Sequence, residues 1–489
     1  MKRLIWLLRR IFVIALVIII GVGTIRTVRL TSRQVATEAV QPVNVGDDAI
    51  RRFSQAIKIP TFSKESKMDS LPFRNLALLF KKNYPHVDSL LEKQPAPPLS
   101  MVFKWPGKNP GLAPVLLMGH TDIVLIDEKT KADWQFPPLS GAVENGYILG
   151  RGTLDDKIAV VGILEAAEML LQEGYTPNRT IYFAFGHDEE IGGENGAKKI
   201  AGWFENQGIT FEYIIDEGML VLEKAMPGIT QPVGLIGIAE KGYATFQIEV
   251  KLEEGGHSSM PPKETAIGLL SETIIKLREN PFPAKVDGAA QELFDYIAPE
   301  MSLPYKVLFA NRWLTNGILL KQLSKGSSAN AMIRTTVAPT IIEGGFQENV
   351  LPSQVSATVN LRILPGETIQ SAKAYLEKII NDDRISITQI SDFSEDPSAI
   401  SPTNSFGFQT IQKTILETFP DVIVAPSLVV AGTDSRHFSR VSKNIYRFLP
   451  MQLAKSDLSR IHGINERISV ENYKRAIRFY KQLMVNSAK

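Results

Sequence analysis

The sequence predicts an α/β fold: an open, mostly parallel sheet flanked by helices, with an inserted ferredoxin-like α+β domain and an N-terminal transmembrane helix. Three observations support this prediction. Short apolar segments, typical of strands, end in residues able to bind a metal, and open α/β sheets place their sites at such ends. A later stretch without such residues alternates between strand and helix patterns. An apolar run between arginines begins the chain.

The N-terminal segment, residues 1–30, predicts a membrane anchor. A charge-free, largely apolar run extends over residues 11–25, with arginines on both sides. The run is short for a membrane span of ~20 residues, but residues 4–8 can extend it if the intervening arginines snorkel. A cleaved signal peptide is the alternative, although no clear small-residue cleavage site directly follows the run. We expect an uncleaved anchor with the catalytic body extracytoplasmic, and a polar linker over residues 31–46.

The most informative motif is the acidic pair Glu189 and Glu190, which follows the apolar run 180–185. That run predicts a buried strand, and the glycines around the pair allow the chain to turn sharply away from the sheet. Because successive side chains of a strand point to opposite sides, the two glutamates cannot easily do the same job. One can bind a metal while the other faces a water molecule beside it. The residues alone do not say which.

Four other short segments, each typical of a strand or a strand end, lead into further candidate ligands. Parallel strands would bring such ends to one edge of the sheet. Five candidates exceed what one tetrahedral zinc ion requires and suit two metals bridged by a shared carboxylate. Their charges also balance, because three carboxylates and one hydroxide neutralise two divalent ions. The candidates are His120, Asp155, Glu190, Asp216 and His462.

Six motifs in order resemble those of the co-catalytic zinc metallopeptidases of the aminoacylase and carboxypeptidase S type. The similarity extends from about Asp47 to the C-terminus. The phrase Phe185–Glu190 is most similar to the carboxypeptidase S branch, which includes secreted and membrane-anchored hydrolases of N-acyl amino acids and peptides. The motifs are His120–Asp122, Gly150–Lys157, Asp188–Glu190, Asp216–Gly218, Gly256–Ser259 and His462–Glu466.

The resemblance implies two zinc ions per subunit, with other divalent ions as alternatives. Asp155 would bridge the two ions. His120 and Asp216 would complete one site, and Glu190 and His462 would complete the other. In the resembled enzymes the peptide bond after the bridging aspartate is cis, so we expect a cis bond after Asp155.

The resemblance also implies the catalytic groups. Glu189 would be the general base, which takes a proton from the water and later delivers it to the leaving amine. Asp122 would hold the His120 imidazole in the correct tautomer. His257 would donate a hydrogen bond to the developing oxyanion from the second domain, sometimes from the partner subunit. By composition alone, the turn around His257 more often carries an ordinary surface histidine.

Three further residues are candidates for substrate binding. Arg362 follows an alternating strand, and the resemblance implies that it pairs with the substrate carboxylate, with Asn349 nearby. Without the resemblance, Arg362 would be a surface charge on a half-polar sheet. Gly432 begins a loop that opens a helix, where backbone N–H groups can hold an anion, and in the family this loop lines the substrate pocket. We interpret His437 in the same loop, and His187, as structural.

The inserted domain is expected over residues 241–392, between catalytic parts at 47–240 and 393–489. With one more strand, its elements would follow the β-α-β-β-α-β order of a ferredoxin-like fold. In the resembled family this insert is the lid or dimerisation domain, which allows a homodimer through it. The strand patterns lie at 243–252, 355–363 and 385–390, and the helix patterns lie at 265–277 and 369–380.

The stretch from Asn280 to Pro339 is larger than a minimal insert needs. Most of its apolar residues are expected to form local core, and one or two are expected to reach the substrate. Together with the anchor, this stretch favours long acyl groups in the substrate. Its apolar residues are Phe294, Tyr296, Leu308, Phe309, Trp313, Leu319 and Leu320.

The sequence therefore predicts a zinc-dependent hydrolase that cleaves an amide bond next to a free carboxylate, as in N-acyl amino acids or short peptides. The alternatives are a dipeptidase or aminopeptidase with the same metals, and a catalytically silent membrane-anchored binding protein. A net charge of +2, without a basic stripe, argues against nucleic acid as a partner. The absence of cysteine excludes disulfides and thiolate ligands.

Overall fold

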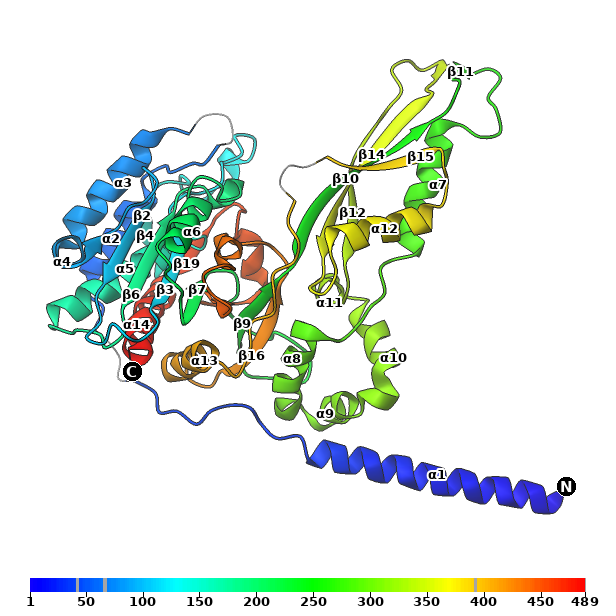
Figure 1. Cartoon of the computed structure of the whole chain (residues 1–489), viewed down its shortest axis with the longest axis horizontal. Helices are drawn as coiled ribbons and strands as arrows, with labels where there is room; N and C mark the ends of the chain where they lie inside the picture. Colours follow the sequence, from blue (N-terminus) through cyan, green and yellow to red (C-terminus); the bar gives the residue numbers. More distant parts are fainter. Residues whose placement is uncertain (41–43, 65–67, 391–393, 489) are drawn as a thin grey trace.

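The computed structural model describes residues 1–40, 44–64, 68–390 and 394–488. Its body has a large unit built on a ten-stranded sheet and a smaller unit built on a four-stranded sheet, and the two lie side by side (Figure 1). A long N-terminal helix, α1 (Lys2–Val28), projects from the body. The expected boundary at residue 392 lies outside the described residues, as do residues 41–43 of the expected linker.

The ten-stranded sheet is mixed, with a parallel centre. Strands β6, β3, β7 and β17 run parallel to one another, as predicted, whereas β1, β2, β8 and β9 add antiparallel pairings toward the edges. In sheet order the strands are β1 (Glu92–Lys93), β2 (Met101–Trp105), β6 (Ile181–Gly186), β3 (Val115–His120), β7 (Tyr213–Asp216), β17 (Ile445–Arg447), β9 (Val233–Glu240), β8 (Val221–Leu222) and β18 (Gln452–Leu453), with β16 (Ile423–Val429) paired to β9.

Helices cover both faces of this sheet, which explains why its central strands are continuous apolar runs. Along β3, Leu117 packs into the core under α5 and α14, while Leu116 and Met118 face the core under α6. The helices of the large unit are α2 (Asp47–Ile57), α3 (Ser70–Asn83), α4 (Pro85–Leu90), α5 (Lys157–Gln172), α6 (Ala197–Asn206), α13 (Phe406–Thr418) and α14 (Val470–Ser487), with short 3-10 helices η1 (Lys131–Asp133), η2 (Glu189–Ile191), η4 (Asp434–Phe438) and η5 (Lys455–Arg460).

A three-stranded sheet joins the C-terminal part of the chain to the region before α5. Strand β5 (Tyr147–Leu149) pairs with β4 (Ala142–Glu144) and with β19 (Arg467–Ser469), all antiparallel. This pairing holds the segment that precedes β19 beside the loop that leads into α5.

The smaller unit has the β-α-β-β-α-β order that the sequence predicts. The strand missing from the sequence-based interpretation is β12, and the sheet order β12-β14-β10-β15 is antiparallel throughout. Two helices cover one face and form a separate apolar core with it. The elements are β10 (Gly242–Lys251), α7 (Ala266–Glu279), β12 (Thr336–Gly344), β14 (Gln354–Ile363), α12 (Ile369–Ile380) and β15 (Ile385–Gln389), and a two-stranded tip is formed by β11 (Gly256–His257) and β13 (Val350–Leu351).

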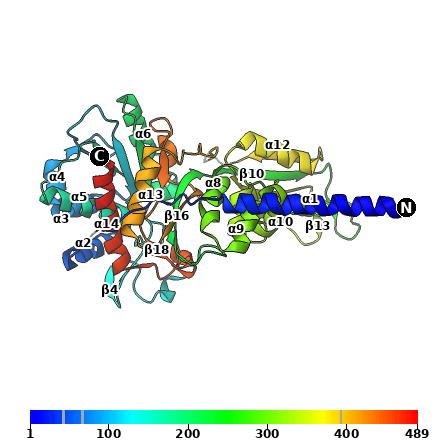
Figure 2. The same cartoon turned by 90° about the horizontal axis from the view of Figure 1, so that it is seen from below.

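A helical insert between α7 and β12 lies at the base of the smaller unit, next to α1 (Figure 2). Phe294 and Phe309 are buried, but they belong to the core of the large unit rather than to a local one. Trp313 is 50% exposed and is an exception to the expectation that most of these apolar residues form core. The insert consists of α8 (Gly288–Ile297), η3 (Ala298–Glu300), α9 (Leu303–Ala310), α10 (Arg312–Leu323) and α11 (Ser327–Ile333).

Helix α1 is the one helix in the described residues that is long and apolar enough to cross a membrane. The segment that follows α1 contacts the body through residues 33 and 34. The Gln34 side chain pairs with the Val424 backbone through two hydrogen bonds of 2.8 Å, and Arg33 lies 3.3 Å from Glu292. The polar segment expected as a linker is therefore bound to β16 and α8 over its first residues.

Candidate active site

The predicted site residues of the large unit come together at the carboxyl edge of the parallel strands. His120 is the last residue of β3, and Glu189 and Glu190 lie in η2, just after β6. Asp155 lies two residues before the start of α5, and His462 lies in the loop before β19. Because these strands are parallel, their ends meet at one edge, as the sequence predicts.

Two imidazoles face the two oxygens of one carboxylate. His120 Nε2 lies 3.0 Å from Asp155 Oδ1, and His462 Nε2 lies 3.0 Å from Asp155 Oδ2. His462 Nε2 is also 3.2 Å from the Glu190 carboxylate. The peptide bond between Asp155 and Asp156 is cis, which confirms the expectation drawn from the resemblance.

The carboxylate that approaches His120 from β7 belongs to Glu217 rather than to Asp216. Glu217 Oε1 lies 3.5 Å from His120 Nε2. Asp216, the last residue of the strand, instead accepts a 2.8 Å hydrogen bond from the Ser435 backbone N–H. Neighbouring residues at a strand end point in opposite directions, so one of the pair must face away from the edge. The structure thus favours Glu217 over the predicted Asp216.

The side chains offer the donor set of a divalent metal site. Ligand atoms of His120, Asp155 and Glu190 all lie within 4.8 Å of one another. A second group with the same spacing contains His120, Asp156 and Glu217. Imidazole nitrogen and carboxylate oxygen are the donors that zinc accepts, and the two groups overlap at His120.

Burial and mutual contact perturb the acidity of these groups. Hydrogen bonds that His462 donates to the carboxylates of Asp155 and Glu190 raise its pKa to about 10. Burial, together with the Asp155 charge, raises the pKa of Glu217 to about 8. Burial opposes ionisation of Asp155 as well, but hydrogen bonds from the two histidines hold its pKa below the usual range. Carboxylates that lie close together repel one another when they are charged. Their pKa values therefore rise, and the same repulsion favours binding of a cation.

The buried carboxylate of Asp122 contacts both the His120 ring and the backbone of the acidic pair. His120 Nδ1 lies 3.2 Å from Asp122 Oδ1, as expected for a partner that fixes the tautomer. The same carboxylate accepts the backbone N–H groups of Glu189 and Glu190 at 3.2 and 3.1 Å, a second role that sequence reasoning missed. One buried carboxylate therefore sets the positions of both the imidazole and the acidic pair.

Glu189 stands beside this cluster and is partly buried. Burial, and the nearby charges of Glu217 and Asp434, raise the pKa of Glu189 well above its ordinary value. A carboxylate with a raised pKa holds a proton more readily, which suits a group that must accept one and give it back.

A buried ion pair fixes the loop that carries Asp155. Arg151 Nη1 lies 2.6 Å from Glu466 Oε2. The other carboxylate oxygen of Glu466 accepts the backbone N–H groups of Gly152 and Leu154 at 2.9 and 2.8 Å. Glu466 lies shortly after His462 in the sequence. The Arg151–Glu466 ion pair therefore links the segments that carry Asp155 and His462, two of the candidate metal ligands.

Two cavities open beside the cluster and share Gly432. The first, about 300 Å³, has Asp155, Glu189 and Glu217 on one side and an apolar wall on the other. None of the described residues of the 280–339 stretch lines it, contrary to the expectation that one or two reach the substrate. The apolar wall includes Met219, Leu220, Leu449 and Met451.

The second cavity, about 240 Å³, lies at the junction with the smaller unit and is lined by charges of both signs: Lys241, Arg362 and Arg436 with Glu240, Glu395 and Asp396. Arg362 lines it, with its guanidinium 4.8 Å from the centre of the Tyr243 ring. Arg436 also lines it and pairs with Glu395 at 3.1 Å. Burial lowers the pKa of Arg362, as expected for a cation in a partly desolvated position.

His257 and Asn349 lie elsewhere. His257 pairs with Val350 in the β11–β13 tip, which Figure 1 shows at the far end of the smaller unit. Its Nδ1 is 2.8 Å from Ser259 Oγ, and the ring is exposed. Asn349 accepts the Ser258 backbone N–H at the same tip. The structure thus keeps these two residues together and does not bring them to the metal cluster.

Asp434 is a buried acid that sequence reasoning did not single out. Neither of its carboxylate oxygens has a hydrogen-bond partner among the described residues. Burial and the charge of Asp216 raise its pKa well above the ordinary value. Its Gly432–His437 motif was visible in the sequence, but nothing there indicated burial. His437 Nε2 lies 2.9 Å from Gly192 O, which fits its structural interpretation.

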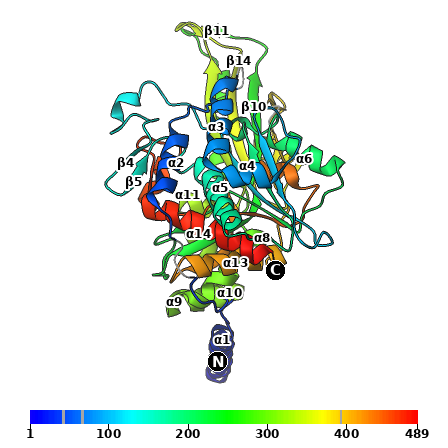
Figure 3. The ribbon, with the colours of Figure 1, turned by 90° about the vertical axis from the view of Figure 1, so that its left-hand side faces the viewer.

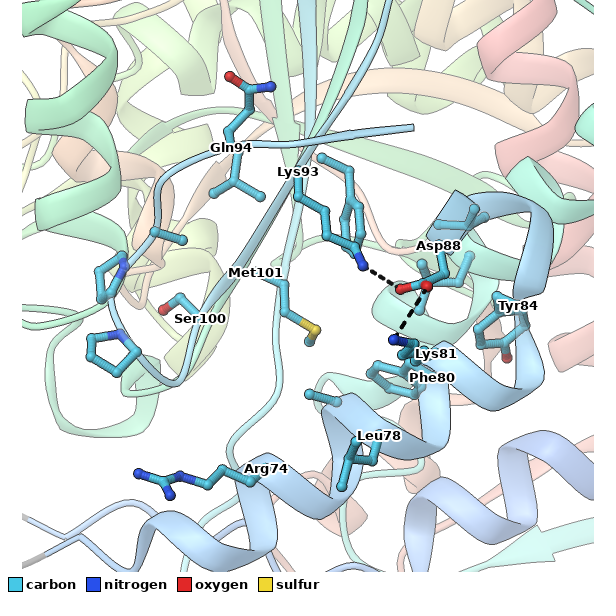
Figure 4. Close-up of a pocket in the computed structure, with 18 residues that line it drawn as sticks. Arg74, Leu78, Phe80, Lys81, Tyr84, Asp88, Lys93, Gln94, Ser100 and Met101 are labelled. Atoms are coloured by element: carbon cyan, nitrogen blue, oxygen red, sulfur yellow. Dashed lines mark hydrogen bonds and ion pairs between the residues drawn. The ribbon is translucent and has the colours of Figure 1, made fainter. Parts of the chain in front are cut away.

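A separate cavity of about 590 Å³ contains none of the predicted site residues (Figure 4). It lies between α3, α4 and the β1–β2 edge. Lys81 and Lys93 both approach Asp88 at its rim. Ser100, in its wall, contacts His187 Nδ1 at 2.7 Å, so this histidine is held by a structural hydrogen bond. Among the residues that the structure describes, its lining contains no metal-binding group.

The α/β sheet with two histidines and several carboxylates gathered at its carboxyl edge defines a metal-dependent hydrolase. A model of the Peptidase family M20/M25/M40 matches residues 116–486, and the chain belongs to this family. The prediction of a metal-dependent amidohydrolase is thereby confirmed.

Named proteins support this placement. A probable carboxypeptidase S-like 2 of Dictyostelium discoideum is 40% identical over 480 residues, which cover 95% of this chain and 91% of that protein. The N-fatty-acyl-amino acid synthase/hydrolase PM20D1 of Xenopus tropicalis is 38% identical, with 97% and 94% covered. The fold is similar to that of an M20 family metallo-carboxypeptidase of Sulfolobus solfataricus, with a TM-score of 0.65, 16% identity, and 90% and 99% covered.

Proposed function

We propose that this protein is a membrane-anchored hydrolase that cleaves the amide bond of N-acyl amino acids next to their free carboxylate. One observation carries the proposal. The metal cluster lies in a cavity with an apolar wall, and this cavity shares Gly432 with a second cavity that contains Arg362. If the amide of a substrate lies at the metal site, its acyl group can contact the apolar wall and its carboxylate can contact Arg362.

We assign the metal ligands as two overlapping sets around Asp155. His120 and Glu217 complete one set, and Glu190 and His462 complete the other. Glu217 takes the place that the resemblance gave to Asp216, because its carboxylate faces His120 at 3.5 Å. Three carboxylates would leave one positive charge from two Zn²⁺ ions.

Divalent metal held by these residues would polarise the amide carbonyl and lower the pKa of a water molecule. Glu189 takes the proton of that water at its carboxylate and holds it, because burial raises its pKa. It then delivers the proton to the nitrogen of the leaving amine. Asp122 keeps Glu189 in place through the backbone hydrogen bond at 3.2 Å. Arg362 binds the carboxylate of the amino acid and so fixes which end of the substrate faces which cavity.

His257 is proposed to donate a hydrogen bond to the oxyanion, and Asn349 to act beside it. Since both lie at the tip of the smaller unit, they must be delivered by closure of this unit as a lid or by a partner subunit. A homodimer is supported by the edge strand β12, where Ile341 and Ile342 are 52% and 66% exposed. An unpaired edge with apolar side chains is a surface that proteins normally cover.

The anchor is proposed to be α1, which places the catalytic body on the extracytoplasmic side. Its apolar residues are exposed and the helix meets the body only near its end. The bonds of Arg33 and Gln34 to the body support a segment that stays with the mature enzyme.

The proposal is tested with N-acyl phenylalanines from acetyl to oleoyl, their methyl esters, and dipeptides, assayed below micelle formation. We expect free acids with long acyl groups to be the best substrates. Arg362→Ala should lower kcat/KM for the free acids by ~30-fold to several thousand-fold, since losing one partner of a buried charge pair costs ~2–5 kcal/mol. The esters should lose much less.

Arg384→Ala is the matched control, because Arg384 lies on the same unit but already pairs with Asp382 at 2.7 Å and Glu264 at 2.9 Å. Its activity should match that of the parent. Equal rates on acids and esters would contradict the role of Arg362. Preference for dipeptides with a free amino group would favour the peptidase alternative.

A further inference from the structure

Helices α9 and α10 expose an unusual amount of apolar surface. Six large hydrophobic side chains of this pair are exposed, and two of them, Leu303 and Ile318, are each 67% exposed. Scattered single apolar residues are normal on a protein surface, but a dense group marks a contact with a partner or a membrane. The six residues, the apolar group of α9–α10, are Leu303, Tyr305, Val307, Trp313, Leu314 and Ile318.

The charge of the same stretch has one sign. Residues 301–342 contain three lysines and two arginines but no aspartate or glutamate. At ordinary composition a stretch of this length would contain about five acids. Lys321 and Lys325, near the end of α10, are exposed. Cations beside exposed apolar and aromatic side chains suit a surface that contacts lipid headgroups.

The apolar group lies next to α1. Views along three axes place α9 and α10 beside the end of α1 that joins the body (Figure 1, Figure 2, Figure 3). Buried Asn311, between α9 and α10, donates to Gly23 O and Thr27 Oγ1 of α1, both at 3.3 Å. Asn311 Oδ1 also accepts the indole N–H of Trp313 at 3.2 Å. One side chain thus links the apolar helix to the exposed tryptophan.

The contact lies where α1 would leave a membrane. The smaller unit runs alongside α1 (Figure 1, Figure 2), so the helix must tilt away from this unit about the contact to cross a bilayer. The apolar run of α1 ends at Ile25 and Arg26 follows, so Gly23 and Thr27 bracket the point where the helix leaves an apolar environment. About 20 helical residues span the ~30 Å hydrocarbon layer, and those before this point suffice. Trp313 therefore lies at the depth where tryptophan is enriched in membrane proteins.

We propose that α9 and α10 rest on the bilayer surface beside α1 and insert the apolar group among the lipid headgroups. This inference rests on the proposed anchoring by α1. Since residues 33 and 34 are also bound to α8 and β16, the body is held at the membrane at several points. The enzyme then keeps a fixed orientation toward a surface that dissolves long-chain N-acyl amino acids.

The absence of cysteine allows a direct test. The full-length chain is reconstituted in nanodiscs of phosphatidylcholine and phosphatidylserine, with one cysteine carrying a fluorescent probe in each variant. We compare Ile318→Cys with Leu78→Cys, which is 64% exposed on α3 of the large unit, and with Ile18→Cys within α1. Lipids with a spin label near the headgroup should quench the probe at 318 by at least about half, and leave the probe at 78 unchanged. Lipids with the label in the middle of the acyl chain should quench the probe at 18.

The Ile18 variant separates the two proposals. Quenching at 18 without quenching at 318 would overturn the surface contact and leave the anchor in place, whereas no quenching at 18 would overturn the anchor. Lys321→Glu with Lys325→Glu should reduce quenching at 318, because it reverses the attraction to anionic lipid. A probe at 318 that is shielded by dimerisation in detergent, but unquenched in nanodiscs, would assign the apolar group to a second copy of the chain.

Discussion

The carboxyl edge of the large sheet and the tip of the smaller unit both carry residues implied in one reaction, yet they are built in different ways. At the edge, His120, Asp155 and His462 are brought within 3.0 Å contacts by strands and loops of one core. At the tip, His257 lies exposed on a two-residue strand pair, with Ser259 as its side-chain neighbour. The edge is assembled by folding, whereas the tip must still be brought to the substrate.

This difference separates two kinds of catalytic group. Groups that hold metal ions must keep their spacing in every state, because ligand distances vary little. A group that only contacts the transition state can be delivered when substrate binds, and its delivery then adds specificity. The comparison predicts that changes at the edge alter metal content or chemistry, and that changes at the tip alter the rate alone.

The largest effect is expected for Glu189→Gln. The amide keeps the size of the side chain but cannot take a proton, so kcat should fall by ~10²- to 10⁴-fold. Metal content, measured by elemental analysis, should stay near that of the parent because Glu189 is not a proposed ligand. His462→Ala is the contrasting variant and should lose metal. If Glu189→Gln lost metal and kept its rate per bound ion, the roles of Glu189 and Glu190 would have to be exchanged.

His257→Ala should lower kcat by ~10²- to 10³-fold, the usual cost of removing one oxyanion donor, without changing metal content. If a partner subunit supplies His257, mixing this variant with Glu189→Gln should restore activity. Mixed dimers then contain one site with both groups intact, and roughly a quarter of parental activity should return in a random two-fold assembly. Absence of recovery in a verified dimer would indicate closure within one chain.

The sequence predicted the edge well because strand ends repeat one pattern. A short apolar run followed by His or Asp identifies both the strand and its carboxyl end, and parallel strands bring such ends together. It could not decide between Asp216 and Glu217, since adjacent acids at a strand end give the same pattern whichever one faces inward. The surroundings of the helical insert were harder to predict from the sequence. Trp313 and Ile318 are apolar residues with helical spacing, and the sequence does not say whether the apolar surface they meet is core or lipid.

A smaller effect distinguishes the two acids at the end of β7. Glu217→Gln should weaken metal affinity by at least ~100-fold, because a charged ligand is lost. Asp216→Asn should cost ~10-fold or less, since Asp216 acts through the Ser435 backbone rather than on the metal. Competition with a chelator of known affinity measures both. The reverse ranking would restore the assignment that the resemblance first implied.

The smallest effect concerns stability and its pH dependence. In metal-free protein the pKa of Glu217 rises to about 8 and that of His462 to about 10. Both shifts favour the protonated form in the folded state. Their contribution to stability is therefore present at low pH and is lost as pH rises, over about 4.5–8 for Glu217 and about 6.5–10 for His462.

Chelated protein should accordingly unfold at a lower temperature at pH 9 than at pH 6. A free zinc concentration ~100 times the Kd at pH 6 adds ~2.7 kcal/mol there, and the same concentration should add more at higher pH, because the Kd falls as the ligands lose their protons. Since every proposed ligand lies on the large unit, hydrogen exchange should slow around β3, η2 and the loop before β19 when zinc is added. The sheet of the smaller unit should exchange at the same rate with and without metal, because its core is separate. Protection that spread equally through both units would show that the metal edge and the tip are coupled before substrate binds.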